Sequence, residues 1–314
     1  MPECKKKTGD SEEGASSTCT HDLVEQFKHW MRYHRGVSES TTRLNATHVS
    51  KFVASVGDNP TTYNAGGVRS FILARASQHS PKYTGTIANA VRMYLRFLVV
   101  NGCCPSDLVA AVPSIANWRL SSIPRYLPAE KVERIISSCD PATMAGARDL
   151  AVLLLLARLG LRAGDVAGLR LEDLDWSRGR LRVMGKGRRE TWLPLPQEVG
   201  DAVLRYLEHF RPDVRDDHVL LRLTPPYRGL RSQTVSMRVR SAIKRAGIDA
   251  PSFGAHMLRH SAATAMLRQG TPLEYIGAIL RHRSIDSTAH YAKVDLPLLR
   301  SVVQPWPTKE RPSC

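Results

Sequence analysis

Residues 256–269 read HMLRHSAATAMLRQ, a stretch in which apolar residues recur at the spacing of an α-helix. His256 and Arg259 are three residues apart, so a helix places both side chains on one face. An imidazole and a guanidinium on one helix face can act together on a charged substrate, and they are also common on a solvated helix surface. Other parts of the sequence are needed to choose between a functional site and a solvated helix surface.

The second half of the chain holds three more distinctive pieces. They are Arg162 just after the glycine that ends the apolar segment 144–159, Lys186 between two glycines at a predicted hairpin tip, and His282 nine residues before Tyr291. Each has an ordinary explanation when taken alone: an arginine paired with Asp165, a solvated turn lysine, a half-buried core tyrosine. Their order along the chain is more specific than any one of them.

The periodicity predicts a small helical domain in the first part of the chain. Residues 1–20 are polar without periodicity, and we expect them to be disordered. Residues 21–112 hold four predicted helices, in 22–31, 42–56, 67–77 and 84–100. Residues 113–128 contain three prolines and no clear period, so we interpret them as a linker.

A second domain is predicted over residues 129–295. Short alternating segments within 172–196, separated by glycine-bearing turns, predict a three-stranded antiparallel sheet. The remaining patterns predict helices in 129–138, 144–159, 198–210, 232–246, 256–269 and 272–280. The expected fold class is therefore α+β, mainly helical with one small antiparallel sheet.

Composition points to a nucleic-acid partner. The 314 residues include 45 Lys and Arg against 29 Asp and Glu, a net charge of +16 that is spread over both halves of the chain. A folded chain that is cationic throughout suits a long polyanion, although charge also serves solubility. Aromatic residues make up only 6% and form no stacking motif, which favours double-stranded DNA over RNA.

Several other classes are disfavoured. The longest apolar run, residues 150–157, is far shorter than the roughly 20 residues that span a bilayer, and no apolar stretch follows the charged N-terminus. The six cysteines form no C-x-x-C pair, as expected of ordinary thiols in a cytoplasmic protein. We therefore expect no membrane association and a cytoplasmic, nucleoid-associated location.

Metal and nucleotide sites are also disfavoured. His256 and His260 are spaced i, i+4 like zinc ligands, but the metalloprotease pattern needs glutamate where Met257 stands. No acidic residue lies between 250 and 273, and Lys186 lacks the rest of a P-loop. We expect neither a metal nor a cofactor.

The second half of the chain resembles the tyrosine site-specific recombinases of the phage integrase family. The resemblance rests on Arg162, Lys186, the His256-x-x-Arg259 box, His282 and Tyr291, which occur in that order. The resemblance covers the second domain almost throughout, which implies a catalytic domain there. It implies, more weakly, a DNA-binding core-binding domain in residues 21–112. Two positions depart from the usual pattern: Arg281 stands where the family often has glycine, and Asp165 where it often has glutamate.

The resemblance implies a covalent reaction on DNA. A tyrosine attacks a phosphate, forms a 3′-phosphotyrosyl link and releases a 5′-hydroxyl, and the hydroxyl of a partner strand reverses the step. The implied roles are nucleophile for Tyr291, phosphate clamp for Arg162 and Arg259, proton donor to the leaving oxygen for Lys186, proton transfer for His256, and phosphate hydrogen bonding for His282.

The resemblance also implies partners. The two domains would close on duplex DNA, with the helices 84–100 and 232–246 as candidates for the major groove. The tail 296–314 would pack into a neighbouring protomer of a homotetramer on two DNA sites, or dock in cis. The protein would act for a mobile element, together with accessory DNA-bending proteins or sister recombinases. The alternatives left open are a type IB topoisomerase and a non-catalytic DNA-binding regulator on the same fold.

Overall fold

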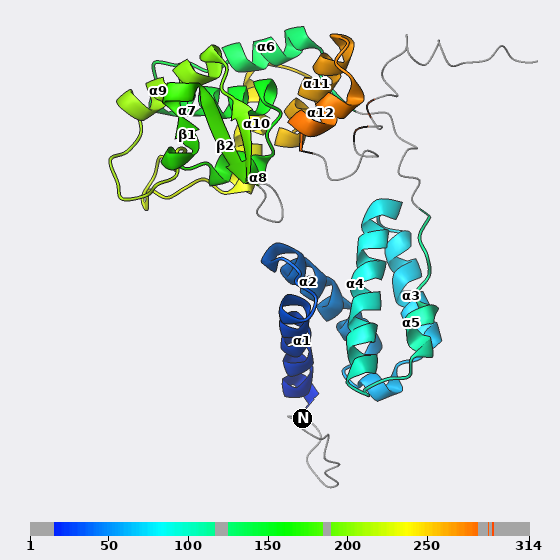
Figure 1. Cartoon of the computed structure of the whole chain (residues 1–314). Helices are drawn as coiled ribbons and strands as arrows, with labels where there is room; N and C mark the ends of the chain where they lie inside the picture. The colour runs from blue at the N-terminus through cyan, green and yellow to red at the C-terminus, as the bar shows by residue number, and fades with distance from the viewer. Residues whose placement is uncertain (1–15, 117–124, 185–189, 282–287, 289–290, 292–314) are drawn as a thin grey trace, which may run out of the picture. The chain divides into compact units, whose positions relative to one another are not determined.

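The structure, a computed structural model, describes residues 16–116, 125–184, 190–281, 288 and 291. The chain divides into two compact units, residues 1–119 and 120–314. Both are built mainly of helices, and the second also contains the one small sheet of the described residues (Figure 1). The predicted fold class, mainly α with a small antiparallel sheet, is confirmed.

The first unit is entirely helical where it is described. Its elements are α1 (Ser16–Tyr33), α2 (Glu39–Val56), the 3-10 turn η1 (Pro60–Thr62), α3 (Ala65–Ala76), α4 (Pro81–Val100) and α5 (Asp107–Ala111). Helix α1 begins inside the stretch 1–20 that was predicted to be disordered, so that prediction is wrong from Ser16 onward. Residues 16–20 carry no apolar side chain at helical spacing, and periodicity therefore could not place this first turn. Residues 1–15 lie outside the described residues.

Helix α4 forms the centre of this unit. It contacts α1, α2, α3 and α5. One stripe of α4 is buried; it consists of Ile87, Val91, Tyr94, Leu95 and Leu98. The ring of Phe27 packs edge-on against Tyr94 at 5.4 Å between centroids. The apolar face of an amphipathic helix thus makes the core, as the period of 3.6 requires.

The second unit begins with helices, and the strands of the sheet follow α8 (Ala163–Gly168) along the chain. Its helices are α6 (Ala129–Ser137), α7 (Met144–Arg158), α8 (Ala163–Gly168), α9 (Gln197–His209), α10 (Ser232–Arg245), α11 (Ala255–Arg268) and α12 (Leu273–Ile279), with short 3-10 turns η2 (Leu171–Asp173) and η3 (Trp176–Arg178). Nowhere in the described part of the chain is a helix long and apolar enough to cross a membrane.

The sheet has the strand order β1-β2-β3, with β1 (Leu174–Asp175), β2 (Arg180–Met184) and β3 (Glu190–Pro194) antiparallel. The chain turns into β2 at Gly179, whose φ of +57° favours glycine. Leu181 and Val183 point into the core, while the intervening residues of β2 face outward. The register pairs Met184 with Glu190, and residues 185–189 between them lie outside the described residues.

Helix α7 lies in the core of the second unit and packs against α9 and α11. Most of its residues are buried, which explains its near-continuous apolar sequence. At the C-terminal end of α7, the half-buried Arg158 donates to the carboxylates of Glu133 on α6 and Glu198 on α9, with closest distances of 2.7 Å to each. One guanidinium thereby fixes the end of α7 to two neighbouring helices.

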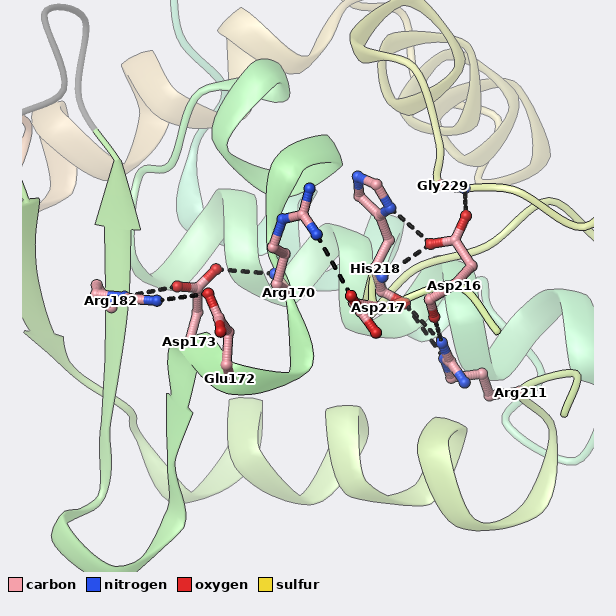
Figure 2. Close-up of polar contacts among 9 residues, drawn as sticks. All are labelled: Arg170, Glu172, Asp173, Arg182, Arg211, Asp216, Asp217, His218 and Gly229. Atoms are coloured by element: carbon pink, nitrogen blue, oxygen red, sulfur yellow. Dashed lines mark hydrogen bonds and ion pairs between the residues drawn. The ribbon is translucent and has the colours of Figure 1, made fainter. Parts of the chain in front are cut away.

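The segment between α9 and α10 is irregular but held by polar contacts (Figure 2). Asp216 accepts from the backbone N–H of His218 at 2.9 Å and from that of Gly229 at 3.2 Å. Arg211 donates to the backbone carbonyls of Asp216 and His218. Arg170 pairs with this segment through an isolated β-bridge to His218. These contacts fix the chain leading into α10, which packs on α8.

Candidate active site

The candidate site begins where α7 ends. Gly160 follows the helix with a φ of +58°, and a Cβ added there would lie 2.5 Å from the Cδ2 atom of Leu280. Only glycine permits this close approach in this backbone conformation. The sharp turn sends the chain at once into α8, so that Arg162 becomes the residue that caps the first turn of α8.

Arg259, on α11, links three parts of the unit. Its side chain is 2% exposed, and it donates to the backbone carbonyls of Gly160 and Leu280. These two bonds use two of its five N–H donors. Burial, reinforced by the nearby charge of Arg162, lowers the pKa of Arg259 to about 10. A buried guanidinium with remaining donors is suited to holding an anion.

Arg162 is placed by two contacts with its surroundings. Its Nη2 donates to the backbone carbonyl of Arg281 at 3.0 Å. Its backbone N–H donates to Oδ2 of Asp165 at 2.9 Å. The same carboxylate oxygen accepts from Nη2 of Arg281 at 2.5 Å. Arg162 and Arg259 therefore both donate to the short stretch 280–281 that follows α12.

Tyr291 is buried against α11 and α12. Its ring is 2% exposed and belongs to an apolar cluster; the other buried members are Ala263, Leu267, Ile276 and Leu280. Burial raises the pKa of the Tyr291 hydroxyl, while the charges of Arg259 and Arg162 act in the opposite direction. The position of the tyrosine beside the two arginines fits the expectation that these residues share a site.

The two histidines of α11 lead toward Tyr291. The ring of His256, which is exposed, lies edge-on to that of His260 at 4.1 Å between centroids. The ring of His260 lies 5.4 Å from that of Tyr291. The described residues contain no group of three or more His, Cys, Asp or Glu placed to hold a metal ion.

Two predicted site residues, Lys186 and His282, lie outside the described residues. Lys186 falls in the connection between the paired strands β2 and β3, and His282 directly follows the described stretch that ends at Arg281. For both, the assigned role stays a prediction. The roles of the other four residues are likewise proposals.

Sequence reasoning did not assign a role to three residues that the structure places here. From the sequence, His260 is considered only as a metal ligand and Arg281 only as a departure from the family pattern. Asp165 is considered as such a departure and as an ordinary partner for Arg162. The helical period of HMLRH does place His260 one turn after His256. The pairing of Asp165 with Arg281, 116 residues apart, has no local signal in the sequence.

The described geometry sets out what the site can do. The site contains two guanidinium groups that have further N–H donors, one buried phenol and one pair of histidines. These groups come from the turn after α7, from α11 and from the segments around α12. Forked donors of this kind bind the non-bridging oxygens of a phosphate, and a phenol beside them is an oxygen nucleophile.

Comparison with known proteins identifies the class. Residues 125–296 match the model of the phage integrase family. This chain belongs to that family and is a tyrosine recombinase by descent. Among its relatives is a putative integrase/recombinase, y4rA, of Sinorhizobium fredii (strain NBRC 101917 / NGR234), which is 41% identical over 290 residues covering 90% of this chain and 70% of the relative.

A second relative is the tyrosine recombinase XerD of Listeria monocytogenes serovar 1/2a (strain ATCC BAA-679 / EGD-e). It is 28% identical over 293 residues, which cover 90% of this chain and 97% of XerD. The fold is also that of solved structures. A lambda integrase (75–356) dimer bound to a COC′ core site matches with a TM-score of 0.68 at 17% identity, over 86% of this chain and 94% of that one.

A XerH site-specific recombinase bound to palindromic difH substrate, in a post-cleavage complex, matches with a TM-score of 0.69 at 16% identity. The match covers 88% of this chain and 83% of that one. At these identities the likeness establishes the fold alone. Together with the family match it confirms the resemblance predicted from the order of the motif residues.

Proposed function

We propose that this protein is a site-specific DNA recombinase that cuts and rejoins duplex DNA through a 3′-phosphotyrosyl intermediate. The observation that carries the proposal is the convergence of Arg162, Arg259 and Tyr291 around the single stretch 280–281 and the face of α11. The family match supports the same chemistry.

In the proposed cleavage step, the hydroxyl oxygen of Tyr291 attacks the phosphorus of a DNA phosphodiester. The bond from the tyrosine oxygen to phosphorus forms, and the bond from phosphorus to the 5′-oxygen breaks. The phenol proton passes to His256, and Lys186 protonates the departing 5′-oxygen. The phosphotyrosyl bond conserves the energy of the broken linkage, so rejoining by a 5′-hydroxyl of a partner strand needs no nucleotide cofactor.

The arginines serve the transition state of this step. Attack places extra negative charge on the non-bridging oxygens, which the unused donors of Arg162 and Arg259 stabilise, with His282 donating a further hydrogen bond. A phenol with an ordinary pKa of about 10 is protonated at neutral pH, and burial raises the pKa of Tyr291 further. The attack therefore needs a group that accepts the phenol proton.

We further propose the setting of the reaction. The substrate is double-stranded DNA held by both units, and most of the affinity comes from phosphate contacts, in line with the net charge of +16. Solved neighbours include a lambda integrase tetramer bound to a Holliday junction, which supports a homotetramer on two DNA sites. Residues 296–314 would link its protomers, and the enzyme would act in the cytoplasm for a mobile element, with accessory DNA-bending or sister recombinase proteins.

The test itself reveals the DNA site, so the target sequence does not have to be known. Wild-type protein and Tyr291→Phe are incubated with total DNA of the cell that carries the gene, denatured in detergent and captured, and the attached DNA is sequenced. The proposal predicts attachment at a few discrete sites, lost in the Phe variant. Scattered attachment would instead indicate a topoisomerase. Salt-sensitive DNA binding without any attachment would indicate a non-catalytic DNA-binding protein.

A further inference from the structure

Arg281 has a backbone conformation that its side chain does not favour. Its φ is +54°, and it is the only described non-glycine residue with a positive φ. Residues with a Cβ rarely adopt this left-handed region, and when they do so the surrounding structure must hold them there. The conformation at 281 therefore calls for a compensating contact.

The compensating contact is the ion pair of Arg281 with Asp165. The side chain of Arg281 is 8% exposed and that of Asp165 is 11% exposed, with 2.5 Å between Nη2 and Oδ2. The same Oδ2 accepts the backbone N–H of Arg162 at 2.9 Å. The side chain of Arg281 thus fixes the carboxylate that fixes the start of α8, where Arg162 lies.

The backbone of Arg281 also contacts Arg162. Its carbonyl oxygen accepts from Nη2 of Arg162 at 3.0 Å. The carbonyl of Arg281 thus holds the guanidinium of Arg162. The side chain of Arg281 holds the carboxylate of Asp165, and this carboxylate holds the backbone N–H of Arg162. Arg281 makes both contacts while its φ is positive.

The charges at this point are unbalanced. The guanidinium of Arg259 interacts electrostatically with those of Arg162 and Arg281 and with the carboxylate of Asp165, which is paired with Arg281. In the described part of the structure, the Nε and Nη1 atoms of Arg281 are buried and have no hydrogen-bond partner. Buried donors without acceptors are costly, and an excess of buried positive charge is relieved by an anion. This arrangement fits a site built to receive a phosphate.

We propose that Arg281 is a positioning residue for Arg162, which it holds both through its own carbonyl and through Asp165, so that Arg162 is in place before a phosphate binds. This inference rests on the proposed function, because Arg162 is the group that would bind the scissile phosphate. Arg281 itself acts on Arg162 and does not need to touch the substrate.

The first test is kinetic and uses Arg281→Gly. Glycine accepts the positive φ without strain, so the substitution removes the side chain and spares the backbone. With saturating DNA that carries the captured site, we expect the single-turnover rate of covalent attachment to fall by about 100-fold, the size of a displacement of one catalytic group by about 1 Å. The DNA concentration for half-saturation should not change.

A rescue experiment separates positioning from a loss of fold. Guanidinium ion at millimolar concentration, added to Arg281→Gly, should restore part of the rate, and sodium chloride at the same ionic strength should not. Wild-type rate in Arg281→Gly would overturn the proposal. A slow variant with a matching drop in melting temperature and no rescue would also overturn it, since the side chain would then be merely structural.

A second measurement distinguishes failure of this inference from failure of the proposed function. In the DNA-free full chain labelled with ¹⁵N-arginine, the Nε–H signal of Arg162 is identified by its loss in Arg162→Lys. We expect Arg281→Gly to shift or broaden this signal and to leave that of Arg158 unchanged. If wild type attaches to no DNA, a shifted Arg162 signal still supports the positioning role, and an unshifted one overturns it.

Discussion

The ring of Tyr291 lies 5.4 Å from the ring of His260, and His260 in turn lies 4.1 Å from His256. The two histidines are one helical turn apart on α11, so they connect the exposed His256 with the buried phenol. We expect the proton that leaves Tyr291 to reach His256 by way of the His260 ring.

Replacement of His260 by phenylalanine tests this connection. His260→Phe keeps an aromatic ring against Tyr291 and removes both ring nitrogens. We expect the rate of covalent attachment to saturating DNA to fall by about 100-fold, the lower range for a positioned proton-transfer group. The matched control is His29→Phe, since His29 stacks on Tyr33 at 4.2 Å in the first unit. A wild-type rate in His260→Phe would mean that the ring only fills space.

Gly160 should tolerate no side chain. Gly160→Ala places a Cβ 2.5 Å from Cδ2 of Leu280 and forces alanine into a φ of +58°. We expect a loss of about 2 kcal/mol or more in the free energy of unfolding, from the backbone conformation and the clash together. Gly164→Ala is the control, because nothing lies within 4 Å of a Cβ there. Chemical denaturation measures both, and equal stability of the two variants would contradict the prediction.

The stability of the first unit should depend on the charge of His48. This side chain is 2% exposed and packs edge-on against Tyr83, and burial first, then the charges of Lys51 and His79, lower its pKa from 6.5. The unfolded state then binds the proton more tightly, so stability is full above pH 6.5 and falls as the pH drops toward the lowered value. Thermal unfolding between about pH 7.5 and 5 should show this loss, and His48→Phe should reduce it. An unchanged slope in His48→Phe would show that another group is responsible.

We expect helix α10 to face DNA in the second unit. Residues 218–248 contain seven Arg and Lys and no Asp or Glu. The exposed Gln233, Met237 and Arg240 lie on one face of α10. We expect Arg240→Gln to weaken binding to the captured site and, if Arg240 contacts a phosphate, to lower the salt slope by about one. Arg178→Gln, at an exposed turn beside Asp175, should bind as wild type does. Equal effects of the two would remove α10 as the DNA-facing helix.

The parts of the fold that depend on local spacing could be predicted from the sequence. The stripe that includes Tyr94 and Leu98 is the buried face of α4, and the alternation around Leu181 and Val183 is the buried face of β2. Periodicity works there because helix and strand geometry alone decides which residues share a face. It missed α5 and α8, since helices of five and six residues are too short to show a period.

The site was predicted as a set of residue types and not as a set of contacts. Order along the chain was enough to select Arg162, Arg259 and Tyr291. The bonds that place the two arginines join residues 99 and 119 positions apart, from Arg259 to Gly160 and from Arg162 to Arg281. Such bonds depend on how α7, α11 and α12 pack, which no local pattern encodes.

The most direct test of the central claim is the chemical identity of the link to DNA. Wild-type protein attached to DNA is denatured and digested with nuclease and trypsin, and the peptide 284–293, SIDSTAHYAK, in which Tyr291 is the sole tyrosine, is analysed by mass spectrometry. We predict a nucleotide joined through its 3′-phosphate to Tyr291, with a 5′-hydroxyl on the released strand. An adduct on any other residue, or continued attachment by Tyr291→Phe, would contradict the assignment of Tyr291 as the nucleophile.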